Sequence, residues 1–122
     1  MGQIKEIICD GCNTSWEIRV GAGRLQGDLQ YITSYFSEND QKEIRSFFER
    51  GDNVSFELEA GYCENCNNLV SKPVLKVEKA DKVVIGICAK CKNKLNHCIL
   101  EDIGCPICQS KKWRKRFIGM WD

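Results

Sequence analysis

Cys9-Asp10-Gly11-Cys12 is the first of four copies of one short pattern, in which two cysteines are separated by two residues. The other copies are Cys63-Glu64-Asn65-Cys66, Cys88-Ala89-Lys90-Cys91 and Cys105-Pro106-Ile107-Cys108. A two-residue spacer lets one tight turn present two sulfur atoms to a metal ion, and two such turns supply the four thiolates of a tetrahedral site. Four turns therefore predict two metal sites, which use eight of the nine cysteines.

The ligand type indicates which metal these sites hold and what it does. A closed set of four thiolates is typical of structural zinc, so we expect two Zn²⁺ ions, with iron as the alternative. A catalytic zinc needs an open coordination position, which four cysteines do not leave. The His-x-Glu pattern of zinc deaminases is also absent from the sequence. We therefore expect a protein that is not an enzyme.

The order of the turns leaves two pairings open. Because adjacent elements usually contact each other, we favour sequential pairing. It gives one site from Cys9, Cys12, Cys63 and Cys66, and a second from Cys88, Cys91, Cys105 and Cys108. The alternative joins turn 63–66 to turn 88–91 across a hairpin, which leaves the first turn to join the last and ties the chain ends together.

Apolar and polar residues alternate at 14–20 and 53–60, which predicts two strands. Between them, Ser37 and Asp40 have the spacing of a helix-capping box. One face of the helix that follows carries Ile44, Phe47 and Phe48. A basic residue followed by glycine, as at 50–51, is typical of the C-terminal end of a helix. Residues 28–36 fit a strand or a short helix equally well.

The second half of the chain has the pattern of a β-hairpin. Residues 69–77 and 82–87 are apolar runs on either side of a turn at 78–81, and Pro73 favours an edge strand. The residue that follows each cysteine turn is expected to adopt a left-handed conformation. Asn13 and Asn67 suit that conformation, whereas Lys92 and Gln109 suit it less well.

The turns 88–91 and 105–108, with a strand after each, resemble a zinc ribbon of the rubredoxin-like kind. Turns 9–12 and 63–66 resemble a second ribbon, expanded by an insertion at about 14–60 that carries the helix. The chain is similar to small two-ribbon proteins of bacteria that mostly lack an assigned function. The resemblance implies a small α+β fold, mainly β, with one ribbon at 1–78 and the other, ending in a basic strand, at 79–122.

Charge is distributed unevenly along the chain, although the formal net charge is only +1. Residues 1–67 contain six Lys/Arg and twelve Asp/Glu, whereas residues 68–122 contain twelve and five. Each filled four-cysteine zinc site adds about −2. With one site in each half, we expect an acidic N-terminal lobe and a basic C-terminal lobe, and their opposite charges could drive self-association.

The tail Lys111-Lys112-Trp113-Arg114-Lys115-Arg116-Phe117 is the strongest candidate for a binding surface. Five cations interleave with two aromatic residues. Cations can contact phosphates while aromatic rings stack on unpaired bases. We therefore expect nucleic acid, or a protein that handles it, to contact Lys111, Lys112, Trp113, Arg114, Lys115 and Arg116. Alternatively, the tail is a solvated edge strand whose aromatic rings pack on the ribbon.

Two other functions stay open. The chain could be a protein-interaction adaptor or inhibitor that uses the acidic lobe, with Tyr31, Tyr35 and Phe36 as anchors. The sequence fits less well with a redox or zinc-handling protein, in which exposed thiolates would release metal when they are oxidised. His97 and Cys98 are interpreted as a strand residue beside a buried free cysteine rather than as ligands.

The start of the chain and its cysteine usage indicate the cellular compartment. The segment MGQIKEIICDGC has no apolar run long enough for a signal peptide or a membrane span. Cysteines in these pairs suit metal better than disulfides. We expect a cytoplasmic protein with no membrane partner.

Overall fold

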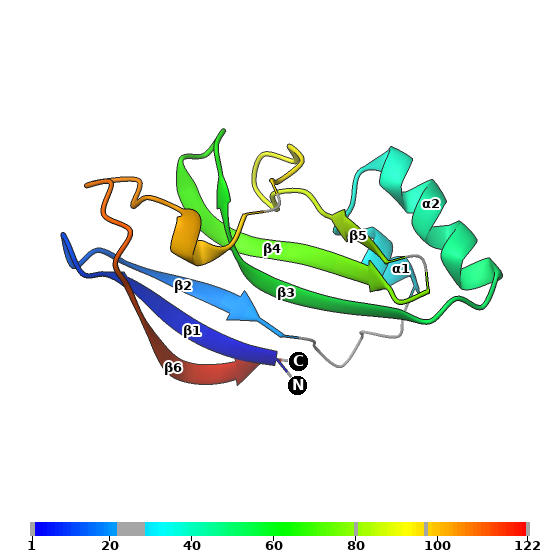
Figure 1. The fold of residues 1–122 in the computed structure, drawn as a ribbon, viewed down its shortest axis with the longest axis horizontal. Coiled ribbons are helices and arrows are strands. Elements are labelled where there is room, and N and C mark those ends of the chain that lie inside the picture. The colour runs from blue at the N-terminus through cyan, green and yellow to red at the C-terminus, as the bar shows by residue number, and fades with distance from the viewer. Residues whose placement is uncertain (1, 22–28, 80, 97, 122) are drawn as a thin grey trace.

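Two three-stranded antiparallel sheets form the protein in a computed structural model, which describes residues 2–21, 29–79, 81–96 and 98–121 (Figure 1). Sheet A has the order β2-β1-β6, and sheet B has the order β3-β4-β5. The strands are β1 (Gly2–Cys9), β2 (Ser15–Val20), β3 (Val54–Cys63), β4 (Asn68–Val77), β5 (Lys82–Ile85) and β6 (Trp113–Trp121). The expected small, mainly β fold of class α+β is confirmed.

Sheet A joins the two ends of the chain. Strand β1 pairs with β2 on one side and with β6 on the other, from Gly2 opposite Trp121 to Cys9 opposite Trp113. The Trp121 indole packs directly on Gly2, where an added Cβ would come within 2.2 Å of the ring. The expected domain boundary between residues 78 and 79 is therefore not where the sheets divide, because segments from both sides of it share sheet A.

Sheet B comes from the middle of the chain as two successive hairpins. Strand β4 lies at its centre, so the expectation that Pro73 marks an edge strand is wrong. The Pro73 carbonyl accepts a hydrogen bond from the N–H of Gly86, the residue that follows the last residue of β5. The Pro73 nitrogen faces that same side, where β5 ends, so its missing N–H removes no bond to β3.

In the described part of the connection from sheet A to sheet B there are two α-helices, which cover one end of sheet B in Figure 1. Helix α1 spans Leu29–Thr33, which settles the ambiguous segment as helical, and α2 spans Glu38–Glu49. The Ser37 hydroxyl accepts a hydrogen bond from the Asp40 N–H at 3.3 Å, as the capping pattern predicted. Along the chain, the helical insertion thus connects sheet A to sheet B and is not part of one ribbon.

The described residues form three apolar clusters, one of which surrounds the central cysteine turns, while the other two join the layers. The larger packs the helices on sheet B and includes Ile32, Phe36 and Ile44 against Phe56 and Leu75. A second cluster lies between the sheets and is completed by a short 3-10 turn, η2 (Leu100–Asp102). The sheets are also joined directly, because Gly21 and Leu58 exchange main-chain hydrogen bonds of 2.7 and 2.8 Å.

None of the helices described is long and apolar enough to cross a bilayer.

Candidate metal centres

The four cysteine turns share one backbone geometry. The residue after the second cysteine has a positive φ in every turn, from +51° to +69°. Lys92 and Gln109 also adopt this left-handed conformation, although their residue types suit it less well than Asn does. In three turns the carbonyl of the first cysteine accepts from the N–H of that residue at 2.8 to 2.9 Å. This tight closure turns both sulfur atoms to the same side, as a metal-binding turn requires.

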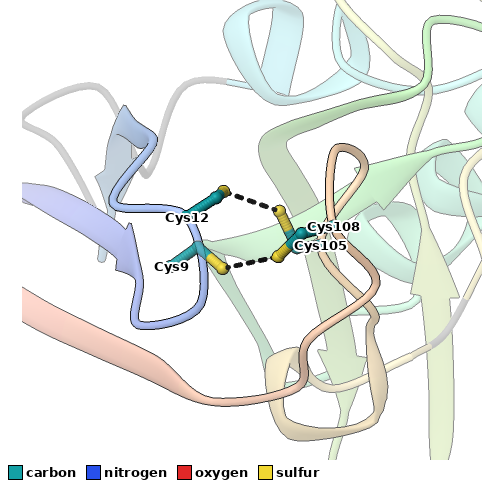
Figure 2. Close-up of side chains that lie close together, drawn as sticks. All are labelled: Cys9, Cys12, Cys105 and Cys108. Carbon is teal, nitrogen blue, oxygen red and sulfur yellow. Dashed lines mark hydrogen bonds between the residues drawn. The ribbon is translucent and has the colours of Figure 1, made fainter.

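The first turn and the last turn meet to form the terminal site, composed of Cys9, Cys12, Cys105 and Cys108 (Figure 2). The Cys9 and Cys108 sulfurs lie 3.4 Å apart, and those of Cys12 and Cys105 lie 3.7 Å apart. The antiparallel pairing of β1 with β6 brings these turns together, since Cys9 ends β1 directly opposite Trp113. Cys108 is the exposed member of this set.

The two middle turns form the central site, composed of Cys63, Cys66, Cys88 and Cys91. The Cys63 and Cys91 sulfurs lie 3.5 Å apart, and those of Cys66 and Cys88 lie 3.8 Å apart. Turn 63–66 is itself the hairpin connection between β3 and β4, and β5 then carries turn 88–91 back to face it.

The favoured sequential pairing of the turns is therefore wrong, and the alternative pairing is the one that the structure shows. Adjacency along the chain favours turns 63–66 and 88–91 as strongly as any other neighbours, because one hairpin separates them. The decisive contact is the pairing of β1 with β6. This contact spans the length of the chain, and local sequence patterns do not report it.

Both four-cysteine groups fit a tetrahedral metal ion. Metal–sulfur bonds of about 2.3 Å place the sulfurs of a tetrahedral site about 3.8 Å apart. All the ligand atoms of each group lie within 4.8 Å of one another. Main-chain N–H groups also point at the sulfurs, with Gly11 donating to Cys9 at 3.3 Å and Ile107 to Cys105 at 3.4 Å. Each group can thus hold one metal ion, and the all-sulfur ligand set suits zinc or iron.

Hydrogen bonds lower the pKa of at least one thiol in each group, and in the terminal group the pKa of Cys9 is lowered as well as that of Cys12. The hydrogen bond with the Thr14 hydroxyl lowers the pKa of the Cys12 thiol to about 6. A main-chain hydrogen bond at Asn93 lowers the pKa of the Cys91 thiol to about 6. In the central group, the hydrogen bond with Cys91 raises the pKa of the Cys66 thiol to about 12. A bound cation must displace the remaining protons, so metal affinity falls as the pH falls.

The ninth cysteine stands apart from both groups. Cys98 is exposed, so its expected burial is wrong. It lies in an irregular segment before η2, where its carbonyl oxygen accepts a 2.7 Å hydrogen bond from the Lys72 ammonium group. His97, its neighbour in the sequence interpretation, lies outside the described residues. Cys98 belongs to neither of the two cysteine groups found in the described part of the chain.

Lys72 is a structural residue that the sequence analysis missed. Its side chain is only 1% exposed, and its ammonium group lies 3.9 Å from a Glu59 carboxylate oxygen. An added Cβ at Gly61 would come within 2.7 Å of the Lys72 side chain, so this glycine makes room for it. The residue ties sheet B to the segment around Cys98. A lone lysine in an apolar run gives no sequence signal for this role.

The basic tail forms most of β6, an edge strand of sheet A. Trp113 is partly buried, with its ring 5.9 Å from that of Trp16 and its indole N–H bonded to the Ile103 carbonyl at 3.0 Å. Three of the cations form ion pairs: Arg114 with Asp10, Lys115 with Glu101, and Arg116 with Glu6. Lys111 and Lys112 are exposed. The structure thus places the five cations on β6 and directly before it, with Arg114 and Arg116 on one face of the strand and Lys115 on the other, and it packs Trp113 inward.

The expected division into an acidic lobe and a basic lobe does not survive the actual strand pairing. The segments that contribute to sheet A and its cysteine turns, 1–21 and 99–122, contain seven Lys/Arg and six Asp/Glu. The remaining segment, 22–98, contains eleven of each. With about −2 for each filled site, the two parts carry about −1 and −2, so they do not have opposite charges, and self-association of the protein stays a prediction.

The aromatic anchors considered for a protein partner are mostly used inside the fold. Phe36 is 1% exposed, and its ring lies 6.1 Å from that of Phe56. Tyr35 is partly buried and shares a 2.8 Å hydrogen bond between hydroxyl groups with Tyr31. Burial and this bond raise the pKa of the Tyr35 hydroxyl to about 12. These residues serve the core before any partner.

No family model, curated protein or solved structure matches this chain. The likeness to zinc ribbons therefore rests on the structure itself, as two four-cysteine clusters on antiparallel sheets.

Proposed function

We propose that this protein is a cytoplasmic, non-enzymatic zinc-binding module of the two-ribbon kind that binds single-stranded or structured nucleic acid along β6. One observation carries the proposal: five cations at 111–116 lie on and beside one edge strand of the sheet that the terminal site anchors. The two metal ions hold this surface in place. Their closed thiolate sets leave the ions no position for substrate.

The ion pairs of β6 do not prevent phosphate binding. The side chains of Arg114, Lys115 and Arg116 are 55%, 47% and 66% exposed. Ion pairs this exposed contribute about 0 to 1 kcal/mol each, so a phosphate group can replace the carboxylate. Lys111 and Lys112 extend the row toward the terminal site, and a polyanion that spans it releases counterions from its own backbone.

Phe117 takes the stacking role that the sequence analysis gave to Trp113. Its side chain is 58% exposed, and it lies on β6 next to Arg116. Alternation along β6 places this ring on the same face as Lys115, and an exposed ring near a cation suits single strands, because every unpaired base offers a face for stacking. Trp113 instead positions the row by packing on Trp16.

Binding of the zinc-loaded protein to a fluorescent 20-mer of deoxythymidine and to an RNA hairpin tests this proposal. We expect anisotropy to show affinity that falls steeply between 20 and 200 mM salt. Replacing Lys111, Lys112 and Lys115 with Ala removes about three phosphate contacts. The logarithmic salt slope for the single strand should then drop by about 2, and affinity at low salt by about tenfold or more. Phe117→Ala should weaken the single strand more than the hairpin.

The matched control replaces three lysines away from β6 with Ala: Lys42, Lys76 and Lys79, which are all exposed. This variant has the same net charge as the first and should bind like the wild type. Absence of binding at 20 mM salt, or equal losses in both variants, would contradict the proposal.

A further inference from the structure

A cleft of about 410 Å³ lies between the two sheets, away from the basic row on β6. One wall is β2, from Trp16 to Arg19, and turn 88–91 contributes Ala89 and Lys90. Leu69, Ser71 and Pro73 alternate along β4 and so share one face of that strand, toward the cleft. Its lining is largely apolar and includes the central-site ligand Cys88, but it contains no residue of β6.

The outer edge of β2 faces this cleft, and in the part of the chain that the structure describes its main-chain groups are hydrogen-bonded at Gly21 and Arg19 but not at Glu17. Gly21 bonds outward to Leu58, and the Arg19 N–H bonds outward to the Ser71 hydroxyl at 3.0 Å. Alternate residues of a strand point their N–H and C=O groups to the same side. Glu17 therefore also points outward, and within the described residues its N–H and C=O have no partner there.

We infer that this cleft binds an extended peptide, which adds to sheet A as a strand beside β2. Strand addition satisfies the free N–H and C=O of Glu17, and it places every second side chain of the peptide on the apolar surface of β4. Because the Arg19 N–H is already bonded to Ser71, the free edge runs from Ser15 to Ile18, about 10 Å at roughly 3.3 Å per residue and enough for about three peptide residues. The rim carries Arg19 and Lys90 beside Glu17, so recognition rests on main-chain pairing and apolar alternation more than on charge.

The probe is a phage-displayed library of random heptapeptides, panned on the immobilised zinc-loaded protein. We expect enrichment of sequences with apolar residues at alternate positions. The consensus peptide, once synthesised, should slow hydrogen exchange of the Glu17 amide by tenfold or more, because that N–H becomes hydrogen-bonded. Exchange at the Glu6 amide, on the neighbouring strand, serves as the internal reference.

Two substitutions at one position isolate main-chain pairing. Glu17→Pro removes the outward N–H without removing a bond to β1, and we expect it to weaken the consensus peptide at least tenfold. Glu17→Ala keeps the N–H and should bind within about twofold of the wild type. Two bound zinc ions per chain and an unchanged thermal midpoint verify the fold of each variant. If Glu17→Pro fails to fold, the wild-type exchange measurement decides.

Several results would overturn this inference. A library that yields no alternating consensus would do so, as would a consensus peptide that leaves the Glu17 amide unprotected. Equal binding to folded Glu17→Pro and Glu17→Ala would show that the cleft takes an apolar ligand without strand pairing. Loss of peptide binding in the β6 lysine variant described above would place the peptide on the basic row instead. Because the two surfaces are separate, failure of nucleic-acid binding does not affect this test.

Discussion

Removing both metal ions with a strong chelator, in the presence of a thiol reductant, is expected to unfold the protein. Structural zinc contributes about 10 to 16 kcal/mol in small zinc-dependent peptides, whereas whole domains are stable by about 5 to 15 kcal/mol. The terminal site joins Cys9 to Cys108, 99 positions away, and Cys12 to Cys105, 93 positions away. Its loss therefore also frees a loop nearly as long as the chain. Circular dichroism should show loss of the sheet signal, with recovery after two equivalents of zinc.

The control for this experiment is the same chelator saturated with zinc before it is added, which should leave the spectrum unchanged. Only the free chelator should abolish cooperative thermal unfolding. A metal-free protein that keeps its spectrum and its thermal midpoint would show that the apolar core holds the sheets without metal, contrary to the role assigned to both sites.

Phe36→Ala should lower the free energy of unfolding by about 3 to 5 kcal/mol. Phe36 is 1% exposed and lies between α1 and α2, where it joins the helices to Phe56 of β3. Truncation leaves a cavity at the centre of the larger cluster. Denaturant titration of the zinc-loaded protein measures the loss, and both metal ions should stay bound because Phe36 does not contact either site.

Phe117→Ala is the matched control, since it removes the same side chain at a position that is 58% exposed. We expect its stability to stay within about 0.5 kcal/mol of the wild type. Similar losses for both substitutions would mean that the helices do not pack on sheet B as described.

Local features of the fold were predictable because short segments determine them. Strands β2 and β3 follow from apolar alternation, and α2 follows from the Ser37 cap and the spacing of Ile44 and Phe47. The left-handed residue after each cysteine pair is set by the turn itself, so even Lys92 adopts it. The set of eight ligands followed from spacing alone.

The pairing of the turns could not be predicted in the same way. It depends on β1 meeting β6, a contact between the two ends of the chain. The fates of single side chains also depend on such contacts: Trp113 packs on Trp16, and Cys98 stays exposed. The apparent charge asymmetry arose from dividing the chain in sequence order, and it disappears when the segments are grouped as the sheets group them.

The pairing of the cysteine turns is the central claim, and zinc stoichiometry of two double variants tests it most directly. Each variant loses two cysteines: Cys9→Ser with Cys105→Ser, and Cys9→Ser with Cys63→Ser. The first pair lies in the terminal site alone, whereas the second takes one ligand from each site. Native mass spectrometry in the presence of a competing chelator should find one zinc ion in the first variant and none in the second. One zinc ion in the second variant and none in the first would contradict the account.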